Sequence, residues 1–269
     1  MSVGERVPQR DRIAFILDAL TQEGHVDVDQ LAEELKVSTA TVRRDLDGLA
    51  LKQLLIRTRG GAVTNSSTYD LPLQYNALRH AEEKRRIARA AADRIAPGSV
   101  VGLNAGTTTT EVSRALAVRP DLEGGERETT LTIVTNAINI AHELTVRSQF
   151  QLLVLGGVVR PASYELIGPL AERALTDISL DEVILSANGI SARSGASCHN
   201  LGEAAIGREM IARAKHVTLV LDASKFDVSC LATMCRIEAV DTVIADAGAR
   251  EHRETIAALE QAGVELVVV

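Results

Sequence analysis

The sequence predicts two folded units. The first is an N-terminal winged helix-turn-helix, mostly α with a small β wing, and the second is a larger α/β domain with a mostly parallel sheet. Three short amphipathic segments and a glycine pair within residues 8–63 indicate the first unit. Apolar, β-branched runs that alternate with helical stretches over residues 81–269 indicate the second. Residues 64–80 are rich in polar and turn-forming residues at their start and are expected to be a linker.

Three helices are expected in the first unit. The stretch RIAFILDAL carries aliphatic residues at i, i+3, i+4 and i+7, and Gly24 follows as a helix end. The stretch DVDQLAEEL repeats this pattern over a shorter length. Ser38 is a good N-cap for a third helix, in which Val42, Leu46 and Leu49 share one face.

The second and third helices are separated only by Lys36–Ser38. So short a connection is typical of a helix-turn-helix, here at about residues 26–45, whose second helix enters the major groove of DNA. Arg44 projects opposite the apolar face of the third helix, and Arg43 lies on its flank. The third helix is therefore expected to carry the DNA-reading side chains.

A short hairpin, or wing, is expected after the third helix. In the stretch LLIRTRGGAV, Gly60 and Gly61 stand at or near the turn, and Arg57 and Arg59 are placed to contact phosphate or the minor groove. The alternatives are a small helical bundle with a solvated charged face, and an interaction module whose winged helix binds protein. The residues expected to contact a double-stranded DNA operator are Ser38, Thr39, Thr41, Arg43, Arg44, Arg57 and Arg59.

The distribution of charge favours DNA over these alternatives. The formal net charge of −7, taken alone, discourages a nucleic-acid partner. Residues 1–35 carry 3 basic against 8 acidic side chains, a net −5, whereas residues 36–64 carry 6 against 2, a net +4. A basic stripe in an acidic protein indicates a local anionic partner. The aromatic content of 2% argues against base stacking on single strands.

Seven strands are expected in the second unit, with helices between most of them. The strands are expected at SVVGL, LTIVT, FQLLVL, DEVILSA, HVTLVL, DTVIAD and VELVVV. The helices are expected at Glu111–Ala117, Ala137–Val146, Leu170–Thr176, Glu203–Ala214 and Glu251–Ala262. Nearly continuous apolar strands fit a sheet that is covered on both faces.

Small and polar residues gather directly after these strands, where open α/β sheets bind ligands. The first strand is followed by NAGTTTT. Its glycine lets the backbone approach closely, and the amides at the start of the next helix point toward an anion. Gly106, Thr107 and Thr108 are therefore expected to bind phosphate, although no Gly-Lys-Ser/Thr of a P-loop is present. The alternative is a plain helix cap made by threonine hydroxyls.

An Ala-rich helix, HAEEKRRIARAAADRI, is expected before the first strand and is stopped by Pro97-Gly98. Its arginines either extend the DNA-facing charge or form a solvated face beside an oligomer contact. No apolar run approaches the roughly 18 residues of a membrane span. The polar start of the chain also lacks the apolar core of a signal peptide, so a cytoplasmic location without a membrane partner is expected.

The three cysteines, Cys198, Cys230 and Cys235, are expected to be reduced. Cys198 and His199 stand side by side and allow a zinc interpretation, but an apolar stretch surrounds the other two cysteines. A structural role is favoured, and neither a metal nor another cofactor is expected.

Part of the sequence resembles a known family. The stretches LAEELKVSTATVRRDLDGL and IRTRGGA resemble the winged helix-turn-helix of DeoR-type bacterial transcription regulators, densely from about Pro8 to Val63. Where the family usually has a histidine before the glycines, this chain has Thr58-Arg59, which bears on the operator that is read. Later stretches, among them NAGTTTTEVSRAL, TIVTNAINIAHEL and LDASKF, resemble the sensor domain of the same family.

The resemblance implies a sensor similar to ribose-5-phosphate isomerase that binds a phosphorylated sugar or polyol. On the family's pattern Gly106, Thr107 and Thr108 would hold the phosphate, and the charged partners would be Arg160, Glu203 and Lys225. The site would be lined by Thr135, Asn136, Gly156 and Gly157. The chain departs from the family at Asn104 and Asn188, where acidic residues are common. Both are still expected in the effector site.

The sequence therefore predicts a DNA-binding repressor of carbohydrate-metabolism genes that a phosphorylated sugar or polyol releases from its operator. The alternative is a sugar-phosphate isomerase or deaminase with an appended DNA-binding domain. The asparagines at 104 and 188 count against catalysis, because an enzyme needs a general base over the sugar carbons. Since helix-turn-helix regulators bind paired half-sites, a homo-oligomer, either a dimer or a tetramer, is expected.

Overall fold

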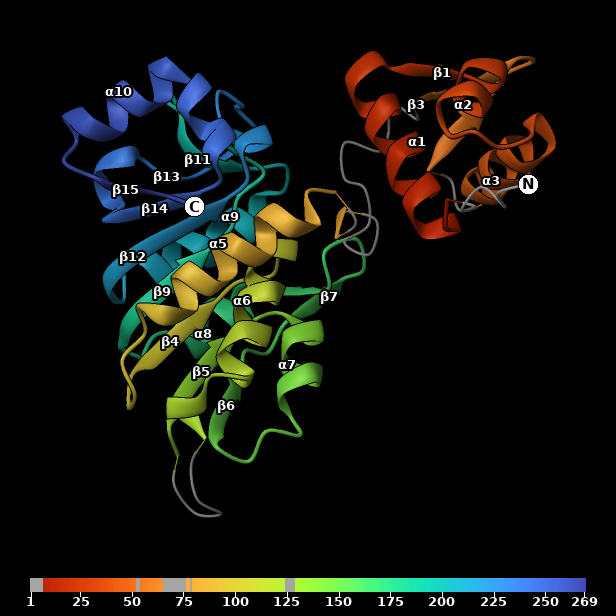
Figure 1. Ribbon diagram of the computed structural model, residues 1–269. Coiled ribbons are helices and arrows are strands. Elements are labelled where there is room, and N and C mark those ends of the chain that lie inside the picture. Colours follow the sequence, from red (N-terminus) through yellow and green to blue (C-terminus); the bar gives the residue numbers. More distant parts are fainter. Residues whose placement is uncertain (1–6, 52–53, 65–75, 78, 124–128) are drawn as a thin grey trace. The chain divides into compact units, whose positions relative to one another are not determined.

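A computed structural model describes residues 7–51, 54–64, 76–77, 79–123 and 129–269 (Figure 1). The chain divides into two compact units, Met1–Arg79 and His80–Val269. Most of the linker that was expected at residues 64–80 lies outside the described residues.

The first unit contains the helices α1, α2 and α3 and a three-stranded antiparallel sheet, in the strand order β1-β3-β2 (Figure 1). Its helices are α1 (Gln9–Glu23), α2 (Val28–Glu34) and α3 (Thr39–Leu51), and its strands are β1 (His25–Asp27), β2 (Leu55–Arg57) and β3 (Gly61–Thr64). Together they form the winged helix-turn-helix that the sequence predicts, which is confirmed.

Local chemistry sets the ends of these helices. Gly24 ends α1 in the left-handed conformation, with φ 75°. Asp27 caps α2, since its carboxylate accepts from the backbone N–H groups of Asp29 and Gln30. Ser38 caps α3 by accepting from the N–H of Thr41 at 3.2 Å, as its residue type predicts.

The wing hairpin is confirmed, and a third strand that the sequence analysis did not predict joins it. Strand β1 pairs with β3, so that Asp27 lies opposite Gly61. A Cβ added at Gly61 would lie 1.8 Å from the carbonyl oxygen of Val26. Gly61 is therefore required by the close approach of β1 as well as by its place near the turn.

An ion pair that the sequence did not predict joins α1 to α3 within the core of this unit. Asp45 is 4% exposed, and its two carboxylate oxygens accept from Arg12 at 2.8 and 3.1 Å. Gln9 donates to the same carboxylate at 3.2 Å. Around this pair the apolar faces of the three helices meet, with Ile16 and Leu46 at 0% exposure.

The second unit is built on a seven-stranded sheet in the order β15-β14-β12-β9-β4-β5-β6, and every neighbouring pair is parallel. The strands are β4 (Val100–Leu103), β5 (Leu131–Thr135), β6 (Phe150–Val154), β9 (Leu180–Leu185), β12 (Ala214–Leu221), β14 (Thr242–Ala245) and β15 (Glu265–Val268). All seven expected strands are present, which confirms the α/β fold class.

Helices cover this sheet on both sides. They are α5 (Ala81–Asp93), α6 (Thr107–Ala117), α7 (Ile138–Leu144), α8 (Pro169–Ala174), α9 (Leu201–Ile211) and α10 (Arg253–Gln261). Short 3-10 turns are η1 (Pro120–Leu122), η2 (Ala223–Lys225), η3 (Ile237–Ala239) and η4 (Ala247–Glu251). Figure 1 shows α5 crossing one face of the sheet, where it packs beside α6 in one buried cluster.

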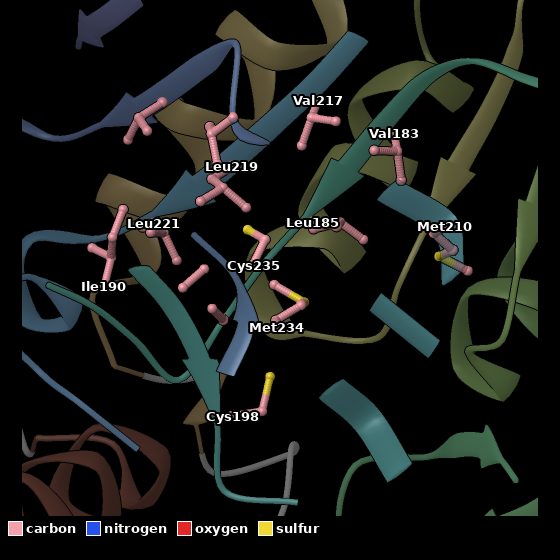
Figure 2. Packing of buried hydrophobic residues seen from close by; sticks show 14 of the residues in the cluster. Val183, Leu185, Ile190, Cys198, Met210, Val217, Leu219, Leu221, Met234 and Cys235 are labelled. Carbon is pink, nitrogen blue, oxygen red and sulfur yellow. The ribbon is translucent and has the colours of Figure 1, made fainter. Parts of the chain in front are cut away.

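Successive strand residues enter opposite cores, which explains the continuous apolar runs in the sequence. Ile184 and Val220 belong to the cluster beneath α5, α6 and α7. Their neighbours Val183, Leu185 and Leu219 belong to the cluster beneath α8 and α9, which Figure 2 shows around the sulfur atoms of two methionines and two cysteines. The sheet is thus buried on both faces.

Two small sheets were not predicted. One is the antiparallel hairpin of β7 (Val158–Arg160) and β8 (Glu165–Ile167), and the other has the order β10-β11-β13. The strands of the latter are β10 (Gly189–Ser191), β11 (Gly195–Cys198) and β13 (Ala232–Cys235). The strands of these two sheets have three or four residues each and lie outside the apolar runs from which the seven parallel strands were predicted. In the described part of the chain, no helix is long and apolar enough to cross a membrane.

Candidate functional site

The exposed face of α3 carries two arginines. Arg43 and Arg44 are exposed, whereas Val42, Leu46 and Leu49 on the other face are buried. Among the described residues, neither arginine has an ion-pair or hydrogen-bond partner. Both guanidinium groups are thus available to an external anion.

The residues at the start of α3 mainly order the helix. The Oγ of Ser38 lies 2.9 Å from the Oγ1 of Thr41 and also accepts the backbone N–H of Thr41. Thr39 is half-buried as the first residue of the helix. The start of the helix, with its free backbone N–H groups, lies beside these side chains.

The two arginines of the wing differ. The Nε of Arg57 lies 2.8 Å from the carboxylate of Asp47 on α3, and its Nη1 donates to the carbonyl of Gly61. Arg57 therefore ties the wing to α3. Arg59 lies at the exposed turn of the hairpin and has no partner among the described residues.

In the second unit, the end of β4 turns into α6 through Gly106. A Cβ added at Gly106 would lie 2.0 Å from the Oγ of Ser186, so only glycine fits between the ends of β4 and β9. Helix α6 begins at Thr107, four residues earlier than the expected Glu111. The predicted start was wrong because the hydroxyls of Thr109 and Thr110 donate back to the carbonyl of Gly106 at 3.1 and 2.7 Å.

The four threonines divide into two pairs. Thr109 and Thr110 cap the helix, and Thr110 also accepts from the Nδ2 of Asn139 at 2.8 Å. The hydroxyls of Thr107 and Thr108 make no hydrogen bond to any described residue, although Thr108 is only 4% exposed. The first pair fits the helix-cap alternative, and the second pair leaves two hydroxyls beside the unpaired amides of the helix start.

Two of the polar residues expected in the site are engaged with the protein itself. Asn104 donates from Nδ2 to the carbonyl of Ser186 at 2.9 Å and accepts the N–H of Ser186 at 3.0 Å, so its amide joins β4 to β9. Thr135 donates to the carbonyl of Leu103 at 2.7 Å and accepts the N–H of Ala137 at 3.0 Å.

A lysine side chain, that of Lys225, lies just after the end of β12. Lys225 lies half-buried in the turn η2. Its ammonium group makes no ion pair or hydrogen bond with any described residue. Burial would raise the pKa of the nearby Asp222, but the charges of Lys225 and Lys84 outweigh this effect and lower it. The carboxylate of Asp222 accepts the N–H of Ser224 at 3.2 Å and so shapes the turn that presents Lys225.

An acidic pair lies beside the end of β5, and one of its members was not anticipated. Glu165 on β8 is 3% exposed. Its neighbour on β8, Leu166, donates its backbone N–H to the carbonyl of Asn136 at 2.8 Å. Burial, and next the negative charge of Glu203 on α9, raise the pKa of Glu165 well above its usual range. Arg160 lies 3.3 Å from the Oε1 of Glu203.

The remaining expected site residues are Gly156, Gly157 and Asn188. Gly156 is exposed, while Gly157 packs closely against the backbone of Ile167. The Oδ1 of Asn188 accepts the N–H of His199 at 3.1 Å. Asn188 therefore orders the connection into α9.

The described residues around the cysteines do not form a set of metal ligands. The Sγ of Cys230 lies 3.8 Å from the Nε2 of His199. Burial, and next the negative charges of Glu203 and Glu165, raise the pKa of the Cys198 thiol. Within the described ranges, no group of three metal-ligating side chains is present. A cavity of about 270 Å³ between η3 and α10 contains none of the expected site residues.

Comparison with known proteins gives matches to both units. Residues 12–68 match the DeoR-like helix-turn-helix domain, and residues 79–247 match the DeoR C-terminal sensor domain. The glycerol-3-phosphate regulon repressor of Escherichia coli (strain K12) is 34% identical over 239 residues, which cover 89% of this chain and 91% of the relative. The transcriptional repressor AccR of Agrobacterium fabrum (strain C58) is 36% identical over 249 residues, covering 92% and 93%.

The chain also has a distant likeness among solved structures. Ribose 5-phosphate isomerase A from Methanocaldococcus jannaschii overlaps with a TM-score of 0.40 at 16% identity, over 55% of each chain.

Proposed function

Because the chain belongs to the DeoR family of DNA-binding transcription regulators, we propose that it represses carbohydrate-metabolism genes until a phosphorylated sugar or polyol releases it from its operator. The family membership confirms the resemblance that the sequence carries. Binding to an operator also requires the cytoplasmic location that the sequence predicts.

The observation that carries the DNA half of the proposal is the pair of exposed arginines on α3. Arg44 is assigned to a base edge in the major groove, because it projects directly away from the buried face. Arg43 on its flank and Arg59 on the wing are assigned to phosphates, with Ser38, Thr39 and Thr41 at the start of the helix beside them. Arg57 contributes through the position of the wing that it holds.

The effector half is carried by the two hydroxyls at the start of α6 that make no hydrogen bond to a described residue. The phosphate is assigned to the amides and hydroxyls of Thr107 and Thr108, directly after the turn at Gly106 that packs against Ser186. An effector phosphate brings up to two negative charges and needs a cation nearby. Lys225 is the first candidate for it, and Arg160 is the second. That an Escherichia coli relative is named for the glycerol-3-phosphate regulon supports an effector of this class.

We further propose that the second unit senses its effector without converting it. The amides of Asn104 and Asn188, where an enzyme would need carboxylates, are bonded to the protein backbone. The buried carboxyl pair of Glu165 and Glu203 is the specific observation that favours the isomerase alternative, because a carboxylate can act as a general base. Sustained conversion of a bound sugar phosphate in proton NMR spectra would decide for the enzyme.

A homo-oligomer, a dimer or a tetramer, forms part of the proposal. It is supported by exposed apolar side chains on β6, an edge strand of the seven-stranded sheet, where Leu153 and Val154 are 37% and 44% exposed. On the neighbouring segment β7, Val158 and Val159 are 69% and 50% exposed. An edge strand with such side chains is otherwise prone to aggregate. Sedimentation velocity of the purified protein measures the oligomeric state.

The proposal is tested as a whole in two steps. A thermal-shift screen against sugar and polyol phosphates identifies the effector, because a ligand at 100 times its Kd stabilises the protein by about 2.7 kcal/mol. Gel-shift titration on the operator, with and without that ligand, then measures release. A protein that no phosphate ester stabilises, or whose operator affinity the stabilising ligand leaves unchanged, contradicts the proposal.

A further inference from the structure

A cavity of about 270 Å³ lies in the second unit and shares no lining residue with the effector site. Its walls come from the turn between β10 and β11, from η3 and from the last turn of α10, a helix that packs against β10 and η3. Only residues 262–264 separate α10 from β15, and only residues 240–241 separate η3 from β14. The cavity therefore lies toward the amino ends of these parallel strands, whereas the effector is assigned to the carboxyl ends.

Two arginines line this cavity. Arg193 lies in the turn between β10 and β11, and Arg236 comes directly before η3. Both are exposed, and in the part of the chain that the structure describes neither guanidinium group makes an ion pair or a hydrogen bond. A guanidinium group binds a carboxylate or a phosphate through a planar fork of N–H groups. Two such forks at one cavity indicate an anionic ligand.

The backbone brings the two arginines together. Strand β11 pairs with β13 so that Ala196 lies opposite Cys235, the residue before Arg236. Gly195 has φ 65°, and a Cβ added there would lie 2.1 Å from the carbonyl oxygen of Cys235 and 2.8 Å from the Cα of Arg236. Glycine at position 195 therefore allows the turn that carries Arg193 to lie against the chain at Arg236.

Three serine hydroxyls order the same turn. The Oγ of Ser191 lies 2.7 Å from that of Ser194 and 2.8 Å from that of Ser229. The Oγ atoms of Ser194 and Ser229 are 2.8 Å apart, and the backbone N–H of Ser194 donates to the Oγ of Ser191 at 3.2 Å. These bonds close the turn and join it to the segment between β12 and β13. Arg193 is thus presented from an ordered segment, which lowers the entropy lost on binding a ligand.

The charges around the cavity indicate the chemistry of its ligand. Glu238 on η3 also lines the cavity, is exposed, and has no ion-pair or hydrogen-bond partner for its carboxylate among the described residues. With Arg193 and Arg236 it gives the lining a net charge of +1, and the other lining side chains are uncharged. A ligand with two carboxylates and one ammonium group pairs with these three side chains one for one.

We propose that this cavity is a second ligand site of the sensor unit and binds an acidic amino acid. The two carboxylates of the ligand bind Arg193 and Arg236, and its ammonium group binds Glu238. A sugar phosphate has no group of positive charge for Glu238 and is repelled by it. The site does not rest on the proposed function, since none of its residues is assigned to the effector.

The test compares each amino acid with probes that lack one of its charged groups. Isothermal titration of the full-length protein uses L-aspartate, succinate, which lacks the ammonium group, and L-asparagine, which lacks the second carboxylate. L-Glutamate is compared in the same way with glutarate and L-glutamine. One of the two amino acids is expected to bind about tenfold more tightly than both of its probes, because each probe loses a charge-assisted pair. Amino acids that bind no more tightly than their probes, or do not bind, overturn the proposal.

Substitutions assign the binding to this cavity. Arg193→Gln and Arg236→Gln are each expected to raise the Kd of the preferred amino acid about tenfold. Glu238→Gln is expected to weaken the amino acid and to tighten the matching dicarboxylate, because a repulsion between like charges is removed. Arg250→Gln removes the same charge from an exposed position of η4 outside the cavity and is expected to change nothing. Unchanged affinity in the folded Arg193 and Arg236 variants overturns the site.

Two further titrations separate this cavity from the effector site. The Thr108→Val, Lys225→Met variant lacks the side chains assigned to the effector phosphate and is expected to bind the amino acid with unchanged affinity. Loss of that binding places the amino acid in the effector site and overturns the proposal. Inorganic phosphate is the other probe, and phosphate binding that Arg193→Gln and Arg236→Gln abolish, without binding of either amino acid, overturns the choice of an amino acid. If no sugar or polyol phosphate binds, the proposed function fails while the amino-acid site is still supported by its own titrations.

Discussion

The two units present their polar side chains in opposite ways. On the winged helix-turn-helix, Arg43, Arg44 and Arg59 are exposed and unpaired among the described residues. At the carboxyl edge of the sheet, Asn104 and Thr135 are buried and bonded to backbone atoms. An exposed arginine on a helix is identified by the helical period alone, whereas the role of a buried polar group depends on partners that the fold supplies. An exposed arginine can therefore be tested by a single substitution, whereas a buried polar residue must be tested together with its partners.

The largest effect is expected at the phosphate position of the second unit. A Thr108→Val, Lys225→Met double variant removes the hydroxyl and the charge that we propose as phosphate ligands, and hydrogen bonds to charged groups are worth about 1.5–3 kcal/mol each. The concentration of effector that releases the operator should rise about a hundredfold or more, while operator affinity is unchanged. A reporter strain should show permanent repression.

The control for this variant lies within the same four threonines. Thr109→Ser keeps the hydroxyl that caps α6 and should respond to the effector normally. A double variant that responds at the concentration of the unaltered chain would show that all four threonines serve only the helix.

The next effect is expected on α3. Arg44→Ala should weaken operator binding by about 1–3 kcal/mol and relax sequence preference, because a bidentate contact to a base discriminates by that amount. Gel-shift titrations on the operator and on single-base variants measure both quantities. Arg250→Ala removes the same charge from an exposed position of the second unit and should bind normally. Equal losses from the two substitutions would indicate a general charge effect.

A stability effect should separate Asn104 from the ligand-binding side chains. Asn104→Ala leaves the carbonyl and the N–H of Ser186 without their partner, and a buried unsatisfied group costs about 1–3 kcal/mol. Urea unfolding of the full chain should show this loss. The effector Kd should change far less than in the threonine and lysine double variant. The reverse pattern, normal stability with lost effector binding, would make Asn104 a direct ligand contact.

The smallest effect is expected on the wing. Arg59→Ala should weaken binding to all DNA sequences alike and flatten the dependence of log K on log salt by about one, as the loss of one phosphate contact does. Arg57→Ala should instead lower the melting temperature, because Arg57 bonds to Asp47 and to the carbonyl of Gly61. An Arg59 variant with an unchanged salt slope would remove the wing from the DNA contact.

The sequence by itself determined the elements whose evidence is local. The helical period, the cap at Ser38 and the hairpin glycines were sufficient for the winged helix-turn-helix, and seven apolar runs were sufficient for the seven strands of the parallel sheet. Each of these signals lies within one short segment, because helix, strand and turn preferences depend on neighbouring residues. The exposed arginines follow from the same periods.

Only the tertiary structure decided how the polar residues are used. Asn104 and Ser186 are 82 residues apart in the chain, and the pKa of Glu165 is raised by its burial in the fold and next by the charge of Glu203 on another element. Strand β1 and the pairing of Asp45 with Arg12 likewise depend on distant segments. A hydrogen bond or an ion pair between such segments leaves no period in the sequence, because the fold alone brings its two ends together.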